Sequence, residues 1–137
     1  MAARTKARKR ALDQLLEAEA RGVNVGDLLR ERLAAPVTEA PLNPYTATLV
    51  EGVVGHWLDI NELLNTYSQG WPVDRMPAVD RAILRIGAFE VLYAEEVPEA
   101  VAISEAVALA TALSTDASPK FVNGLLGRLA QVKPTLA

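Results

Sequence analysis

The stretch Ala78-Val-Asp-Arg-Ala-Ile-Leu-Arg-Ile-Gly-Ala-Phe-Glu-Val-Leu-Tyr-Ala94 decides the fold of this 137-residue chain. Its apolar side chains recur at helical spacing and cover nearly the whole circumference of a helix: Val79, Ile83, Leu84, Ile86, Ala88, Val91 and Tyr93. Only a buried helix can hide so much apolar surface from water. We therefore predict a central helix over residues 78–94, with other helices packed around it.

Helical periodicity continues on both sides of this stretch, interrupted at prolines and glycines. Proline lacks an amide hydrogen and clashes with the preceding turn, so it collects at helix starts and in loops. Asn24 and Asn43-Pro44 are typical helix starts, and Gly22 is a typical helix end. Further helices are predicted over about 5–20, 24–34, 43–55, 56–68 and 100–113, with a last one containing 122–132. Residues 35–41 are predicted to form a loop.

Strand signals are weak, because no alternating run of β-branched and aromatic residues is bounded by hairpin turns. The prediction is an all-α protein with about six or seven helices.

Basic side chains are concentrated at the beginning of the chain. The first ten residues contain Arg4, Lys6, Arg8, Lys9 and Arg10 and no acid. The rest of the chain, with 9 basic and 17 acidic residues, carries a net charge of −8. A positive cluster on an acidic protein indicates a surface that binds anions such as phosphates. Charge alone is equally compatible with a solvated tail that keeps the protein soluble.

Several classes of function are excluded by composition. The chain has no cysteine, which excludes disulfides, thiolate metal sites and a cysteine nucleophile. Its one histidine, His56, has no second histidine with which to share a metal, and no glycine-rich phosphate loop is present. We expect no active site, no metal and no cofactor. No signal peptide and no run of about 20 apolar residues is present, so we expect a cytoplasmic protein without a membrane segment.

Aromatic side chains that could stack on RNA bases are few. Phe121, beside Lys120 at the start of the last helix, and Tyr67, near a helix end, are the candidates. Both are also compatible with a place in the core. Trp57 and Trp71 are predicted to anchor helix packing.

Charged residues on the apolar helices need a partner or a route to solvent. Asp80 lies in a first helical turn, where a negative charge favours the helix dipole. Arg81 and Arg85 are expected to reach the rim of the central helix. Glu90 and Glu105 lie on apolar helices, so each must meet an arginine or the amides of a helix start.

Three blocks of the C-terminal half together resemble the NusB family of transcription antitermination factors. They are Arg81-Ala-Ile-Leu-Arg-Ile86 with Glu90, then Val97-Pro-Glu-Ala-Val-Ala-Ile-Ser-Glu-Ala-Val107, then Ser114-Thr115 followed by Phe121-Val-Asn-Gly-Leu-Leu126. Ala7-Arg8 with Ala11-Leu12 and Leu15 fits the opening helix of that family, and Gly70-Trp-Pro-Val-Asp-Arg75 is similar to its actinobacterial branch. The resemblance spans nearly the whole chain.

This resemblance implies a single NusB-like domain over 1–137. Within it, a three-helix N-terminal bundle and a four-helix C-terminal bundle are expected, with subdomains of about 1–70 and 71–137. Family members bind the boxA element of ribosomal RNA leader transcripts together with the ribosomal protein NusE, in a complex on RNA polymerase that opposes termination. The resemblance therefore implies an RNA-binding adaptor and not an enzyme.

The same resemblance assigns residues. RNA binding is implied for Arg4, Lys6, Arg8, Lys9, Arg10, Lys120 and Phe121, with Tyr67 added as a stacking candidate. Asp80 and Leu16 match positions near the NusE surface. Ala117 stands where the family resemblance implies an acidic residue that contacts RNA, and Leu16 stands where relatives often have an aromatic residue. The RNA contact at Ala117 and the partner contact at Leu16 are therefore left undecided. The affinity for boxA RNA is expected to fall steeply with salt concentration, because the protein neutralises about four or five phosphates.

Two alternatives to the adaptor are considered. One is the NusB-like recognition module found beside RNA cytosine methyltransferases, for which the chain leaves no room for a cofactor-binding sheet. The other is a protein-binding bundle, including a homodimer that covers the RNA surface.

Overall fold

The structure is a computed structural model that describes residues 2–35 and 43–136. Its helices are α1 (Ala3–Arg21), α2 (Val25–Ala34), α3 (Pro44–Gly55), α4 (Trp57–Tyr67), α5 (Ala78–Tyr93), α6 (Glu99–Leu113) and α7 (Ser118–Val132), with short 3-10 helices η1 (Val73–Arg75) and η2 (Lys133–Thr135). These ranges contain no strand, which confirms the all-α prediction. Most of the loop predicted over 35–41 lies outside the described residues.

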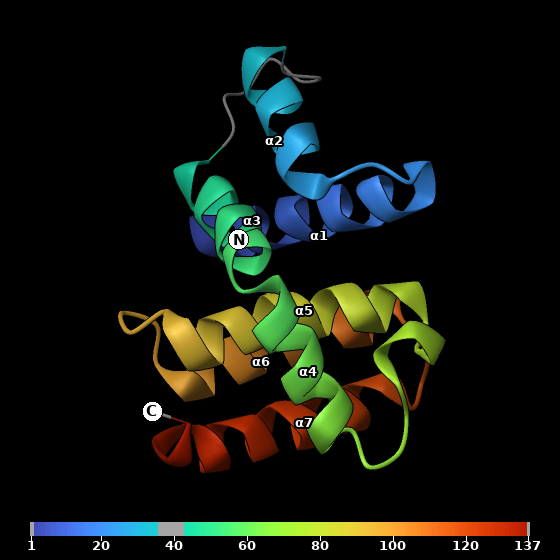
Figure 1. Cartoon of the computed structure of the whole chain (residues 1–137). Coiled ribbons are helices and arrows are strands. Elements are labelled where there is room, and N and C mark those ends of the chain that lie inside the picture. The colour runs from blue at the N-terminus through green and yellow to red at the C-terminus, as the bar shows by residue number, and fades with distance from the viewer. Residues whose placement is uncertain (1, 36–42, 137) are drawn as a thin grey trace.

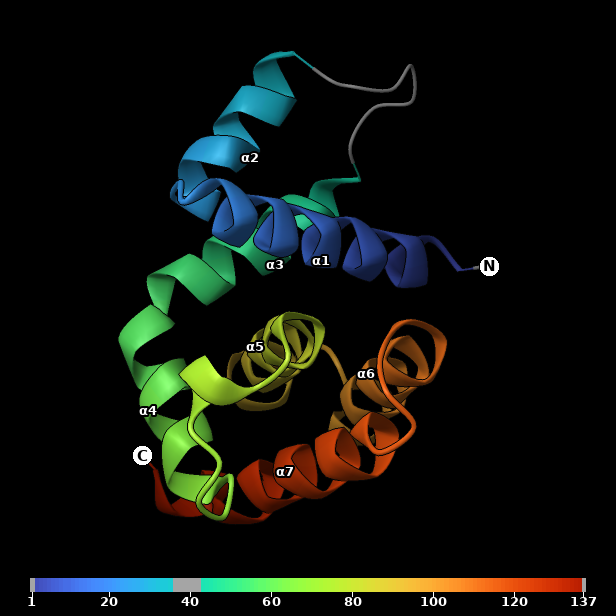
Figure 2. The same cartoon turned by 90° about the vertical axis from the view of Figure 1, so that its right-hand side faces the viewer.

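Helix α5 is the central element, as its apolar circumference predicts. It contacts α1, α3, α4, α6 and α7. In Figures 1 and 2, α1, α2 and α3 lie above it, while α4, α6 and α7 enclose it from the sides and below. Ten of its 16 residues are buried, including Ile83, Leu84 and Ile86. Each such aliphatic side chain contributes about 1.5–3 kcal/mol when fully removed from water.

The helix boundaries follow the predicted signals. Gly22 adopts φ +67°, a left-handed conformation open to glycine, and ends α1. The side chain of Asn24 accepts hydrogen bonds from the N–H groups of Gly26 and Asp27 at the start of α2. Asn43 accepts from the N–H of Tyr45, with Pro44 as the first residue of α3. These local signals determine where α1 ends and where α2 and α3 begin.

Glycines allow α5 to approach two neighbours closely. A Cβ added at Gly87 would lie 2.6 Å from Cδ1 of Leu126 on α7. One added at Gly52 on α3 would lie 2.2 Å from the ring of Phe89. Both distances are too short for real contacts, so α3 and α7 pack at these spacings only because glycine is present.

The division into subdomains at about residue 70 stays a prediction. Helices α1, α2 and α3 contact one another, whereas α4 contacts α5 and α7 as well as α3. None of the described helices combines the length and the apolar character that a membrane span requires.

Candidate nucleic-acid interface

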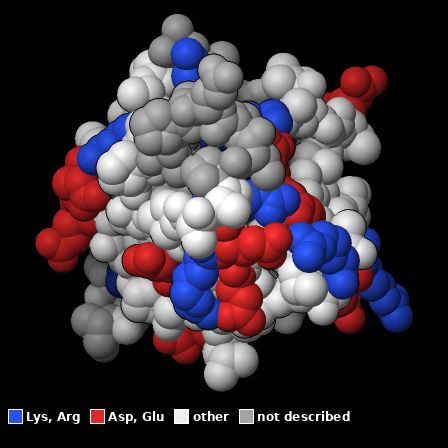
Figure 3. Space-filling view, turned by 90° about the horizontal axis from the view of Figure 1, so that it is seen from above, with Lys and Arg blue, Asp and Glu red and all other residues white. Residues whose placement is uncertain are grey.

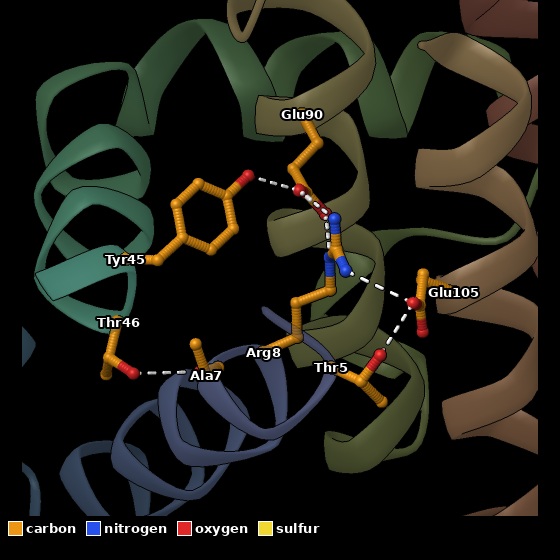
Figure 4. Close-up of polar contacts among 7 residues, drawn as sticks. All are labelled: Thr5, Ala7, Arg8, Tyr45, Thr46, Glu90 and Glu105. Carbon is orange, nitrogen blue, oxygen red and sulfur yellow. Dashed lines mark hydrogen bonds and ion pairs between the residues drawn. The ribbon is translucent and has the colours of Figure 1, made fainter. Parts of the chain in front are cut away.

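The basic start of α1 is attached to the core through a buried ion pair (Figure 4). Nε of Arg8 donates to Oε1 of Glu90 at 2.8 Å, and Nη2 donates to Oε2 at 2.9 Å. Arg8 is 3% exposed and Glu90 is 2% exposed. Burial disfavours the charge of Arg8, but the hydrogen bonds and charge of Glu90 outweigh it, so the pKa of Arg8 is raised. Of the two kinds of partner predicted for Glu90, an arginine or the amides of a helix start, the structure shows the arginine.

Two further groups extend this ion pair into a network that joins four helices. The hydroxyl of Tyr45 on α3 donates to Oε2 of Glu90 on α5. Glu105 on α6 forms an ion pair with Nη1 of Arg8 at 3.3 Å and accepts a hydrogen bond from the hydroxyl of Thr5 at 2.7 Å. Burial raises the pKa of Tyr45, and donation to Glu90 raises it further, so the phenol stays a donor. This network fixes the orientation of α1 relative to α5 and α6.

The five basic residues predicted to face RNA therefore separate into two kinds. Arg8 differs from that expectation, because its guanidinium lies inside the protein against two carboxylates. Arg4 and Lys6 are exposed, and Arg4 places its Cζ 4.3 Å from the ring centroid of Tyr45. Lys9 pairs with Asp13 at 2.6 Å on the surface, and Arg10 is half-buried. We call Arg4, Lys6, Lys9 and Arg10 the basic site.

Acidic side chains accompany the basic ones on the face formed by α1 and α2. Glu17 on α1 pairs with Arg21 on its own helix and with Arg32 of α2. Figure 3, a view from above, shows basic and acidic side chains next to one another on this face. The positive charges of Arg21 and Arg32 on this face are thus partly balanced by a neighbouring acid.

The first turn of α5 holds the connection between α6 and α7. Asp80 is 1% exposed and accepts hydrogen bonds from the hydroxyls of Ser114 and Ser118, the latter at 2.9 Å. Ser118 is the first residue of α7, so Asp80 fixes where that helix begins. Asp80 was expected near a protein-partner surface. In the structure its carboxylate instead points inward, onto the hydroxyls of Ser114 and Ser118.

The start of α7 presents the aromatic candidates. Lys120 is exposed, and Phe121 is half-buried with its ring centroid 4.8 Å from that of Trp71. Tyr67 is half-buried, and its carbonyl accepts a hydrogen bond from Nε of Arg128 at 2.9 Å. We call Tyr67, Lys120 and Phe121 the aromatic site. Trp71, predicted as an anchor of helix packing, lies between α4 and η1 and leaves 37% of its surface exposed.

The basic and aromatic sites lie at different ends of α5. The basic site is held near Glu90 and the aromatic site near Asp80, ten residues or about 15 Å apart along the helix. Helix α6 runs between them, because Glu105 contacts α1 and Ser114 contacts the first turn of α5. A ligand that reaches both sites must be extended and negatively charged. Single-stranded RNA has these properties.

A second surface has the character of a protein-docking groove. It encloses about 470 Å³ and is lined by residues that include Leu15, Val54, Trp57 and Arg85. The guanidinium of Arg85 lies 4.2 Å from the ring centroid of Trp57, and burial together with nearby Arg81 lowers the pKa of Arg85 to about 10. Leu16, predicted as a partner contact, is half-buried and packs against the core next to Leu15. Aromatic and arginine side chains in an apolar groove are typical of protein interfaces.

No metal site is found in the described ranges, where no group of three or more His, Asp or Glu side chains could hold an ion. His56 instead stacks on Tyr93, with ring centroids 3.7 Å apart and an angle of 7° between the planes.

Comparison with known proteins agrees with this arrangement. Residues 5–131 match the NusB family. The chain is 60% identical over 136 residues to the transcription antitermination protein NusB of Arthrobacter sp. (strain FB24), covering 99% of this chain and 98% of that protein.

The fold is shared with solved structures. The T. maritima NusB structure superposes with a TM-score of 0.82 at 28% identity, covering 95% of this chain and 92% of that one. A chain from a crystal structure of antitermination factors NusB and NusE in complex with double-stranded RNA gives a TM-score of 0.79 at 25% identity, covering 94% of this chain and 96% of that one. The chain belongs to the NusB family.

Proposed function

We propose that this protein is a transcription antitermination factor that binds boxA RNA of ribosomal RNA leaders together with NusE, on RNA polymerase in the cytoplasm. It acts by binding and carries out no catalytic step. The observation that carries this proposal is the placement of exposed cations at the start of α1 and of Lys120 beside Phe121 at the other end of α5. Relatives named as NusB antitermination proteins, and the fold shared with a NusB–NusE–RNA complex, support it.

Each surface has its own task in this proposal. The basic site contacts phosphates, which gives affinity without reading sequence. The aromatic site holds unstacked bases. NusE docks beside Leu16 and the groove at Trp57. Ala117, at the exposed end of the α6–α7 connection, offers no carboxylate, so no acidic RNA contact is made there.

Titration of fluorescently labelled boxA RNA tests the proposal. Anisotropy is measured with this protein alone, with NusE alone and with both, and a scrambled RNA of equal length is the control. We expect the tightest binding of boxA RNA with both proteins and weaker binding of the scrambled RNA. Equal affinity for the two RNAs in the presence of both proteins would overturn the proposal.

A further inference from the structure

We propose that Trp71 is a base-stacking residue of the RNA interface and extends the aromatic site by one ring. This inference rests on the proposed RNA-binding function and assigns a residue to it. Trp71 packs its ring against Phe121 with an angle of 52° between the planes, and leaves 37% of its surface open to solvent. An indole offers a large π-face, and every base can stack on such a face.

The segment that carries Trp71 is fixed by hydrogen bonds on both sides. Before it, the carbonyl of Tyr67 accepts from Arg128 of α7. After it, the N–H of Val73 donates to Oδ1 of Asn65 at 2.8 Å, and Nη1 of Arg81 donates to the carbonyl of Met76 at 2.6 Å. The indole is therefore held in place before RNA arrives, and binding pays little ordering entropy at this position.

The backbone turns sharply just before Trp71. Gln69 has φ +59° and Gly70 has φ +89°, both in the left-handed region. A left-handed conformation is uncommon for a residue with a side chain such as Gln69. This turn directs the chain across the start of α7, where Phe121 and the exposed Lys120 lie. Cation and aromatic rings together are the combination that binds single-stranded nucleic acid.

Trp57 provides a matched comparison within the same chain. It is 38% exposed, almost the same as Trp71, but its ring carries the guanidinium of Arg85 at 4.2 Å. It lies in the groove formed with Leu15 and Val54, away from Phe121. Both tryptophans are therefore similarly exposed, but only Trp71 of the two contacts the aromatic site.

Two single-tryptophan variants separate the residues spectroscopically. Trp57→Phe leaves Trp71 as the only tryptophan, and Trp71→Phe leaves Trp57. BoxA RNA is titrated into each variant with NusE already bound, so that any NusE emission is the same in both titrations. We expect RNA to quench the emission of Trp71 by more than about half and that of Trp57 only slightly, because stacking on a base quenches indole fluorescence. Labelled RNA reports binding in parallel through its anisotropy.

Affinity provides the second readout. Stacking on an aromatic side chain is worth about 1–3 kcal/mol per base, so Trp71→Ala is expected to weaken boxA binding about 5- to 150-fold. Trp71→Phe should restore most of this loss. Leu33→Ala, at a 50% exposed apolar side chain on α2 outside both RNA sites and the groove at Trp57, should leave RNA affinity unchanged. Thermal melts of each variant check that α7 remains folded.

The outcomes distinguish this inference from the function on which it rests. If the wild-type protein binds boxA RNA but Trp71 emission stays constant and Trp71→Phe and Trp71→Ala bind equally well, the stacking role is wrong and the proposed function stands. If the wild-type protein with NusE fails to bind boxA RNA, both are wrong.

Discussion

The two ends of α5 each hold a buried carboxylate, but they use it differently. Glu90 meets the guanidinium of Arg8 and the phenol of Tyr45, whereas Asp80 meets the hydroxyls of Ser114 and Ser118. At the first end a basic residue is withdrawn from the surface to hold α1. At the second end neutral hydroxyls hold the start of α7, and nearby Lys120 is exposed. The same element thus supports both halves of the proposed RNA interface by two kinds of contact.

The largest effect is expected from breaking the charged end. Glu90→Ala leaves Arg8 buried without its bidentate partner, which costs about 3–5 kcal/mol of unfolding free energy. Urea denaturation measures it. Glu90→Gln keeps an acceptor for Tyr45 and should lose less. A loss below about 1 kcal/mol for Glu90→Ala would show that the ion pair does not hold α1.

A smaller effect is expected at the hydroxyl end. Asp80→Ala removes the acceptor of Ser114 and Ser118 and should cost about 1–3 kcal/mol. Ser118 retains its hydrogen bond with Thr115, which limits the loss. Denaturation and RNA titration are measured together, because a displaced α7 start should also weaken boxA binding. A stability loss equal to that of Glu90→Ala would remove the contrast between the two ends.

Replacing exposed cations should change RNA binding and leave stability almost unaltered. The double variant Arg4→Ala/Lys6→Ala removes two exposed charges. Its unfolding free energy should stay within about 0.5 kcal/mol of wild type. The slope of log affinity against log salt should become shallower by about 1.4, since each contact to a single strand contributes about 0.7. An unchanged slope would show that Arg4 and Lys6 do not contact the RNA phosphates.

The smallest effect concerns an exposed ion pair. Hydrogen bonding from Arg21 lowers the pKa of Glu17; desolvation opposes this shift, and the charge of Arg32 and its hydrogen bond add to the lowering. Because the folded pKa lies below the ordinary 4.5, this contribution is present above pH 4.5 and is lost as the pH falls through the folded value. Glu17→Gln should therefore melt slightly below wild type at pH 7, and the difference should vanish in acid. A difference independent of pH would exclude this origin.

Local signals were sufficient to predict most of the fold. Helix periodicity around Ile83 gave the central helix, and Asn24, Asn43 and Gly22 gave boundaries, because each acts through its own backbone. The need of Glu90 for a polar partner, an arginine or the amides of a helix start, also followed from the cost of burying a lone charge. The sequence did not indicate which arginine contacts Glu90. Arg8 is one of five basic residues in the first ten, and only tertiary packing turns it inward.

The exposure of the aromatic residues was equally beyond local reasoning. Trp71 and Phe121 are residue types that usually lie in a core. Their exposure to solvent depends on tertiary packing, which local sequence patterns do not specify. The left-handed turn at Gln69 is likewise not encoded by a residue that favours it. The Gly-Trp-Pro stretch at 70–72 contains residues typical of a constrained loop.

The central claim is that Arg8 belongs to the protein interior while its neighbours bind phosphate. The salt dependence of boxA binding by Arg8→Met/Glu90→Gln tests it most directly, because this double variant leaves the net charge of the protein unchanged. The account predicts the wild-type slope for the folded double variant, beside the shallower slope of Arg4→Ala/Lys6→Ala. A slope reduced by about 0.7, the value of one lost phosphate contact, would contradict it.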